Sequence, residues 1–379
     1  MIPRARHLVA AALSSALLML PAFTGISNAL AETATSTATS AAAAPSHVYT
    51  VPLAKTVDDV KKVAEYWRPE KLKKADSYSP ATPGSQAAPT SSAAAAAGPT
   101  HRAAGAIKRP ATTANDLQGA LAARSTPART MGKVYFRFGA KEYWCSASAV
   151  SARNRSVVAT AGHCAFDARQ TKAPEYWIFV PNPGVNGEAP DGIYVGASVS
   201  MHEDWPGKGD YDYDYAFVTV HRGFTWVSKN GGYVMADVGR LQDNIGGQGL
   251  ELNKRPSTYT VASFGYPAGA QPDGTRPYDG RTLQMCPIGP TRWTVAPSRG
   301  LQKGVLLQPC AFSPGASGGP WLTGYDKNRG LGKLTGVNSL TWNTDAKGGY
   351  DAVSSPYFDT ATGDVYRDAA GRSTPGSVT

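Results

Sequence analysis

The most regular feature of the chain is a series of short apolar and aromatic runs that begins near residue 131. Each run is five to eight residues long, and turn residues such as Gly, Pro, Asn and Asp separate it from the next, which is typical of strands joined by turns. The runs are KVYFRF (133–138), SVVATA (156–161), YWIFV (176–180), AFVTV (216–220), STYTVASF (257–264), GVLLQ (304–308) and KLTGVNSL (333–340). The gaps between them carry no helical periodicity and leave no room for regular βαβ units. The pattern predicts an all-β domain over about residues 131–365.

The first residues have the pattern of an export signal. Arg4 and Arg6 precede an apolar run from Leu8 to Leu20, and the small-x-small sequence ALA ends at residue 31. The run is too short for an ordinary membrane span, and no later stretch is long and apolar enough to be one. We expect residues 1–31 to be a signal peptide and the mature protein to be secreted, without membrane association.

Residues 32–130 are rich in Ala, Ser, Thr and Pro. Such a composition buries too little apolar surface to offset chain entropy, so we expect a largely disordered pro-region. Within it, residues 56–75 place Val57, Val60 and Trp67 at helical spacing. This predicts a short amphipathic helix, either a surface-docking helix of a pro-segment or, as the less favoured alternative, a separate small binding module.

Composition and charge narrow the function classes. Of the 379 residues, 42% are hydrophobic and only 17% are charged, with 40 Gly and 28 Pro, which excludes a coiled coil and favours β-structure with many turns. The net charge of +10 would suggest a nucleic-acid partner, but residues 131–379 hold 24 Lys and Arg against 21 Asp and Glu. That balance is too weak a field for phosphate-backbone binding, so no nucleic-acid partner is expected.

Three segments combine a buried strand with a reactive side chain. SVVATAGHC ends an apolar strand on His163, YDYDYAFVTV places Asp214 just before another strand, and SPGASGGPWL is a glycine-rich turn that carries Ser317. A serine hydroxyl is a poor nucleophile at neutral pH, so it needs a general base and a carboxylate that holds the base in the right tautomer. Attack on a carbonyl creates an oxyanion, for which the N–H groups of Gly315 and Ser317 are the expected donors.

Other residues compete for these roles. His202 lies in a polar stretch, and His221 follows a strand as an expected surface residue, so both are weaker candidates for the base. Asp210 and Asp212 rival Asp214, but only Asp214 adjoins the apolar run that would bury it.

Two further interpretations are disfavoured. Glu203 and Asp204, with Asp210 and Asp212, could bind calcium, but they lack an EF-hand spacing, and we expect a solvated acidic loop and no metal. GASGG also matches the nucleophile elbow of α/β-hydrolases, in which the histidine follows the serine, whereas all six histidines here precede Ser317.

In their order along the chain, these residues resemble the chymotrypsin/trypsin-type serine proteases. The family's TA-(A/G)-HC motif is matched by Thr160–Cys164, its D-x-A-hydrophobic strand by Asp214–Phe217, and its G-D-S-G-G-P motif by Gly315–Pro320. Many members have an aspartate at the position of Ala316, which pairs with a new N-terminus on activation, so that mode of activation is not expected. The motifs look closest to the bacterial secreted trypsin-like and glutamyl-endopeptidase-like branch.

The resemblance implies a fold of two packed antiparallel six-stranded β-barrels. The implied division is a signal peptide (1–31), a pro-region (32–130), a first barrel (about 131–225), a second barrel (about 250–365) and a C-terminal tail (366–379). The four cysteines could pair in any of three ways on sequence alone. The resemblance favours Cys145 with Cys164 and Cys286 with Cys310.

Specificity follows from the same resemblance. The floor of the primary pocket would be Ala311, and an uncharged floor does not offset the desolvation of a bound cation. Phe312 would narrow the pocket, and Asn338 stands where a histidine selects glutamate, so small or medium apolar residues are expected before the scissile bond. The expected substrate-binding residues are Ala311, Phe312, Ser339, Leu340 and Thr341.

Taken together, the sequence predicts a secreted, monomeric serine endopeptidase that hydrolyses proteins or peptides through an acyl-enzyme and needs no cofactor. His163 would be the general base, Asp214 the residue that orients it, and Ser317 the nucleophile. The alternative is a catalytically silent binding protein of the same fold, such as a surface adhesin, against which the intact set of three residues argues.

Overall fold

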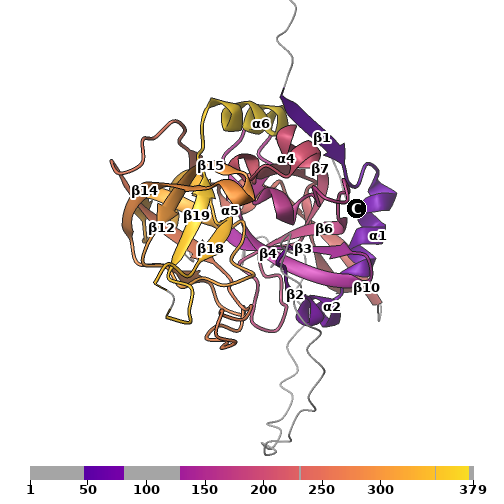
Figure 1. Cartoon of the computed structure of the whole chain (residues 1–379). Helices are drawn as coiled ribbons and strands as arrows, with labels where there is room; N and C mark the ends of the chain where they lie inside the picture. The colour runs from indigo at the N-terminus through magenta and orange to yellow at the C-terminus, as the bar shows by residue number, and fades with distance from the viewer. Residues whose placement is uncertain (1–46, 81–128, 230–231, 346, 375–379) are drawn as a thin grey trace, which may run out of the picture. The chain divides into compact units, whose positions relative to one another are not determined.

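The computed structural model describes residues 47–80, 129–229, 232–345 and 347–374 (Figure 1). The expected signal peptide and most of the expected pro-region lie outside these ranges.

A closed six-stranded antiparallel barrel forms the first half of the β-rich domain. Its strands are β3 (Met131–Phe138), β4 (Lys141–Val150), β5 (Val157–Thr160), β6 (Glu175–Pro181), β7 (Tyr194–His202) and β8 (Ala216–Val220). The ladder runs β7-β6-β3-β4-β5-β8, and β8 returns to pair with β7, which closes the barrel. Val134, Phe179 and Val218 are fully buried in its interior, as the apolar runs of the sequence predict.

A second sheet is formed by strands of the C-terminal half of the chain, which run from orange to yellow in Figure 1. Its strands are β11 (Gly249–Leu250), β12 (Thr260–Gly265), β13 (Gln284–Met285), β14 (Gly289–Ala296), β15 (Leu301–Leu307), β16 (Pro320–Asp326), β17 (Leu331–Val337), β18 (Leu340–Trp342) and β19 (Ala352–Pro356). Their order is β11-β17-β16-β12-β14-β15-β19-β18, with β13 beside β12.

The two ends of the second sheet come together without a continuous ladder of hydrogen bonds. The chain turns after Val337 into β18, and β18 takes the free edge of β19. Strands β17 and β19 therefore meet through single hydrogen bonds instead of a ladder: Val337 N donates to Ser355 Oγ at 3.0 Å, and Ser339 N donates to Ser354 O at 2.9 Å.

Shorter elements surround the two sheets. They are the hairpin strands β9 (Gly223–Lys229) and β10 (Gly232–Gly239), the helices α4 (Asp204–Lys208) and α5 (Leu241–Ile245), and the 3₁₀ turns η1 (Gly162–Cys164), η2 (Tyr211–Tyr213) and η3 (Pro297–Arg299). None of the helices in the described part of the chain has the length and apolar character needed to cross a membrane.

Residues 47–80, which we call the N-terminal segment, fold against the first barrel. The segment contains β1 (Val48–Pro52), α1 (Val57–Tyr66), α2 (Pro69–Lys74) and β2 (Asp76–Ser77). The two helices lie within the range where the sequence predicts a short amphipathic helix, and Thr56 caps the first of them. This segment shares a core with the barrel, although the composition of residues 32–130 as a whole predicts none. The average over that range hides a local concentration of buried apolar residues that includes Trp67 and extends to Ala75.

The C-terminal part also differs from the expected tail. Helix α6 (Thr360–Gly371) begins at a capping box on Asp359 and packs on β7 and β8. Val365 and Ala369 are fully buried, one helical turn apart, and the helix that carries them crosses the expected tail boundary at residue 366. The helix is amphipathic, but alanine and glycine make its apolar face weak in the sequence.

Lys133 of β3 provides a test of this packing, since its side chain is buried over the ring of Trp144, with Nζ 4.2 Å from the ring centroid. Burial lowers the pKa of this lysine to about 7. Between about pH 7 and pH 10 this lysine is therefore neutral in the folded protein but still protonated in the unfolded chain. The free energy of unfolding should rise with pH in that window, by up to about 1.4 kcal/mol per pH unit.

We expect Lys133→Met to be more stable than the wild type at pH 7, because no cation is then buried. The difference should shrink as the pH approaches 10. Urea unfolding at several pH values measures it, with Lys141→Met at an exposed lysine as the control. A difference that does not vary with pH would show that Lys133 is not buried as a neutral amine.

Candidate active site

The three residues singled out by the sequence lie where the two sheets share a core. His163 is in η1 directly after β5, Asp214 precedes β8, and Ser317 is in the loop before β16. Phe217 of the first sheet and Leu322 of the second belong to one buried cluster beside them. The position of each residue at a strand end thus follows from packing of the adjoining apolar strand.

Asp214 is completely buried and orients His163. The imidazole Nδ1 lies 2.9 Å from Oδ2 of the carboxylate, and the His163 backbone N–H donates to Oδ1 at 2.8 Å. Ser339 Oγ donates a further hydrogen bond to Oδ2 at 2.6 Å. Because a carboxylate only accepts, Nδ1 must carry a proton, and in the neutral ring the lone pair is then on Nε2. This arrangement can make Nε2 a base.

The Nε2 atom is buried and has no hydrogen-bond partner among the described residues. No hydrogen bond joins it to the Ser317 hydroxyl in this structure, although such bonds are often loose without substrate. The backbone nevertheless brings the loop of Ser317 against the chain that leads to His163. Ser146 N donates to Ser317 O at 2.8 Å, and a Cβ atom at Gly318 would lie 2.8 Å from Ala161 N.

The N–H groups of Gly315 and Ser317 have fixed directions, because the carbonyl group of each of these two peptides is held by hydrogen bonds. Pro314 O accepts from Ala268 N and from Gly269 N, both at 2.9 Å. In a trans peptide the N–H points opposite to the C=O, so the N–H of Gly315 is directed away from residues 268–269. Gly315 has a φ of 100°, which a residue with a side chain rarely adopts.

The second carbonyl is that of Ala316. It accepts hydrogen bonds from Gly319 N at 3.1 Å and from the side-chain amide of Asn338 at 3.0 Å. Because the peptide group is planar, these bonds also fix the direction of the Ser317 N–H. Among the described residues, neither the Gly315 nor the Ser317 N–H donates a hydrogen bond within the chain. Two free donors beside a serine are what an oxyanion site requires.

Asn338 is a residue whose part in this geometry the sequence did not indicate. Its side chain is buried and makes four hydrogen bonds, so both its donors and both acceptor positions are used. The amide Nδ2 donates to Ala316 O and to Phe264 O at 2.8 Å, and Oδ1 accepts from Ser263 Oγ and Trp321 Nε1, both at 2.7 Å. The available signal was a polar residue directly after an apolar strand and beside Ser339.

The expected substrate-binding residues separate into two groups. Leu340 and Thr341, with Ser339, line a cavity of about 140 Å³ that also contains Ser317. Ala311 is exposed, and Phe312 is buried in the core of the second sheet instead of narrowing this cavity. Phe312 packs inward because the strand-like alternation around Cys310 turns its ring toward the core.

The rival residues have other partners. His202 stacks on Tyr213 with ring centroids 3.6 Å apart. His221 was expected at the surface but is 1% exposed, because its ring reaches the carbonyl of Ala54 at 2.9 Å, and burial lowers its pKa. Asp212 accepts two backbone N–H groups of β15, and Asp210 caps η2. None of these residues contacts the Asp214 carboxylate through a hydrogen bond in the described part of the chain.

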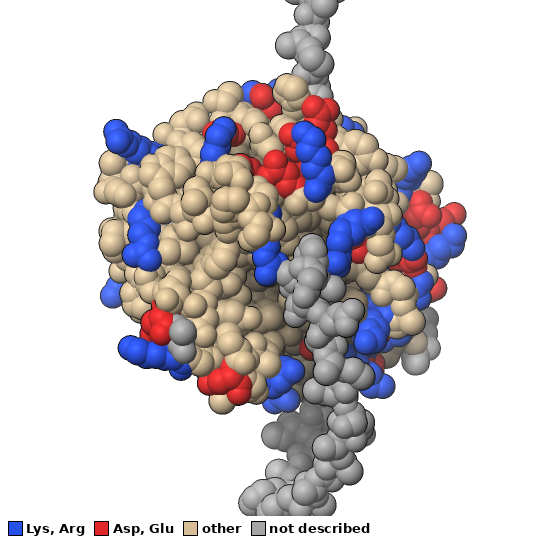
Figure 2. Space-filling model, viewed as in Figure 1, with Lys and Arg blue, Asp and Glu red and all other residues tan. Residues whose placement is uncertain are grey.

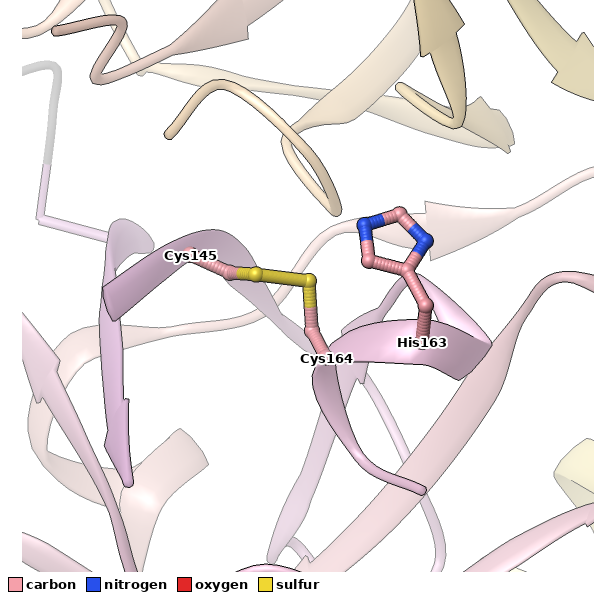
Figure 3. A group of neighbouring side chains, drawn as sticks. All are labelled: Cys145, His163 and Cys164. Atoms are coloured by element: carbon pink, nitrogen blue, oxygen red, sulfur yellow. A yellow bond between two sulfur atoms is a disulfide. The ribbon is translucent and has the colours of Figure 1, made fainter. Parts of the chain in front are cut away.

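The acidic residues weighed for calcium are also engaged. Glu203 pairs with His47 and Asp204 with Lys208. The described residues contain one group with metal-like spacing, formed by Cys145, His163 and Cys164, which Figure 3 shows. Its two sulfur atoms form a disulfide and are not thiolates, which are the form that binds metals.

Both disulfides pair as the resemblance implies. Cys145–Cys164 ties β4 to η1 beside His163, and Cys286–Cys310 braces the chain that leads to Ser317. On the face seen in Figure 2, Lys and Arg are scattered among uncharged residues and groups of Asp and Glu, and they form no continuous stripe. This distribution agrees with the near balance of charge over residues 131–379.

Solved structures provide the comparison with known proteins. The chain is similar to the thermostable serine protease AL20 from an extremophilic microorganism, with 26% identity over 65% of this chain and 99% of that one, at a TM-score of 0.52. It is also similar to the protease Anisep from Arthrobacter nicotinovorans, with 29% identity over 65% of this chain and 98% of that one, at a TM-score of 0.52. No protein-family model and no curated protein matches the sequence.

These likenesses cover nearly the full length of two serine proteases. The chain is a serine endopeptidase and belongs to the chymotrypsin/trypsin-like serine protease family.

Proposed function

We propose that this protease is a secreted endopeptidase that uses Ser317, His163 and Asp214 as its catalytic triad. The observation that supports this most directly is the buried His163–Asp214 pair, which leaves Nε2 as an unpartnered base beside the loop of Ser317. The structure provides no comparable orientation for His202 or His221.

The reaction has two stages, acylation of Ser317 and hydrolysis of the acyl-enzyme. Ser317 Oγ attacks the peptide carbonyl carbon while His163 Nε2 takes the hydroxyl proton, and Asp214 stabilises the imidazolium. The oxyanion accepts hydrogen bonds from Gly315 N and Ser317 N. His163 then protonates the leaving amine, which breaks the C–N bond, and water repeats the sequence on the acyl-enzyme, releasing the acid and the serine hydroxyl.

Ser339, Leu340 and Thr341 form the wall along which the acyl side of the substrate lies, since they line the cavity that holds Ser317. Ser339 has a second role, because its hydroxyl binds Asp214. The one charged side chain among the described residues that line this cavity is Arg299, which would repel a basic substrate side chain.

The precursor organisation is part of the proposal. Residues 1–31 would direct export, residues 32–130 would be cut from the rest of the chain as a pro-region, and the domain from residue 131 onward would act extracellularly. The two disulfides are consistent with an oxidising compartment.

Ser317→Ala and His163→Ala should each lower kcat by about a thousandfold or more, and the double variant should be no worse than either alone, because the two groups act as one unit. The protein recovered from culture medium is assayed on a protein substrate and labelled with a fluorophosphonate probe. Mass spectrometry should find the label on Ser317. Turnover at the wild-type rate in either variant would exclude the triad, and an unlabelled, inactive wild type would favour a silent binding protein.

Asn338→Asp should lower kcat by about 10- to 100-fold with little change in KM, because the Ala316 carbonyl then loses a donor and the Ser317 N–H loses its fixed direction. Asn328→Asp, in an exposed turn, is the matched control. Thermal unfolding of both variants separates this effect from general loss of structure. An unchanged kcat in folded Asn338→Asp would show that the amide does not orient the oxyanion site.

Cleavage after Lys or Arg should be rare, because no carboxylate among the described residues lines the cavity beside Ser317 and Arg299 does. Digestion of a peptide library, with cut positions found by mass spectrometry, measures this preference. The Ser317→Ala protein provides the blank. A digest dominated by cuts after basic residues would contradict the assigned wall.

A further inference from the structure

We propose that the N-terminal segment is a built-in inhibitor: residues 76–80 occupy the catalytic cleft, and residues 47–75 bind the first barrel firmly enough to keep them there after the chain is cut beyond residue 80. This inference rests on the proposed triad and concerns the regulation of the same site.

The segment is bound as an integral part of the first sheet. Strand β1 pairs antiparallel with β7 from Val48↔His202 to Pro52↔Ser198, and Leu53 N extends the pairing to Ala197 O at 2.8 Å. These are the backbone contacts of an ordinary sheet edge, which do not depend on the covalent connection that follows residue 80.

Apolar side chains add to this pairing. Val60, Ala64 and Trp67 are buried in one cluster with Tyr135 and Ile178 of the barrel. Trp67 has no exposed surface, and its indole N–H also donates to Tyr176 O at 2.5 Å. Such a tryptophan contributes more buried apolar area than most other side chains.

Polar contacts fasten the opposite end of the segment to the C-terminal helix. Thr50 Oγ1 donates to Asp368 Oδ2 at 2.9 Å and accepts from Arg372 at 2.9 Å. Asp368 also accepts from Ser200 of β7 at 2.7 Å. The segment is therefore held by β7, by the barrel surface and by α6.

From this anchorage the chain passes into the cleft. Strand β2 pairs in parallel with β4, with Ser77 opposite Trp144, and Tyr78 N donates to Trp144 O at 2.9 Å. Ser77 lies against the oxyanion turn, because a Cβ atom at Gly315 would be 3.1 Å from Ser77 Cβ. Part of the surface beside the two free N–H groups is thus already covered.

The next residues cover the base and the nucleophile. The Tyr78 ring lies 6.1 Å from the His163 ring, and His163 is only 3% exposed. Ser79 and Pro80 line the same cavity as Ser317 and Thr341. A substrate that must reach both His163 and Ser317 meets residues 78–80 first, so the cleft opens only when this part of the chain moves away.

The first experiment measures access to Ser317. Freshly purified full-length chain, shown by mass spectrometry to be uncut, is treated with a fluorophosphonate probe and the labelling rate is followed. Tyr78→Ala combined with Pro80→Gly should label at least about tenfold faster than the wild type, because more of the molecules then have an open cleft. Tyr233→Ala combined with Pro290→Gly removes the same residue types from exposed sites and should label as slowly as the wild type.

Equal labelling rates for the wild type and the Tyr78→Ala/Pro80→Gly variant would overturn the inhibitor, while labelling at Ser317 would still support the triad. If processed enzyme from culture medium also fails to label, the proposed function fails and this inference fails with it.

The second experiment tests the docking without any catalysis. In a Ser317→Ala chain, the recognition sequence of a site-specific protease is inserted after residue 90 and cut, and the product is passed over a size-exclusion column. The two fragments should elute together, since β1 and Trp67 remain bound. Separate elution of the fragments directly after the cut would overturn docking, whatever the mechanism of the enzyme.

Discussion

The buried carboxylate of Asp214 is the interaction on which the rest of the site depends. It receives hydrogen bonds from the ring and backbone of His163 on the first sheet and from Ser339 on the second. A buried charge is stable only when such donors surround it, so the two sheets must keep their relative position for the site to exist. The same contacts that satisfy the carboxylate also set the tautomer of His163. The contacts that hold the two sheets together therefore also orient the proposed base.

Much of this arrangement could be predicted from sequence, because the three motifs sit at the ends of strongly apolar strands. His163 and Asp214 fall where the apolar runs place them, and the disulfide Cys145–Cys164 pairs as the resemblance implies. The exposed Ala311 and the buried Phe312 could not be placed in this way, since a shift of one residue in a short irregular segment reverses which side chain faces the cavity.

Other features were hidden because they depend on long-range contacts. The sequences of β1 and β7, taken separately, do not indicate that the two strands pair. The apolar positions of residues 47–80 are also hard to recognise, because the chain on both sides of them is rich in Ala, Ser, Thr and Pro. The same holds for α6, whose small buried residues have meaning only against β7 and β8. The sequence indicates for Asn338 a part in specificity alone, because the four partners that it joins lie on two strands, β12 and β16, and in the loop of Ser317.

Ala316 connects the geometry of the site to its regulation. Many members of the family have an aspartate at this position, which pairs with a new N-terminus on activation. Here the carbonyls of Pro314 and Ala316 are already anchored by backbone N–H groups and by Asn338 in the uncut chain. Cleavage is then not needed to build the donors of the oxyanion site. On the proposed assignment of the site, an uncut chain that already holds both donors can be kept inactive by denying access to them. A segment bound as a strand of the first sheet is suited to that task, because its affinity does not depend on the chemistry of the site.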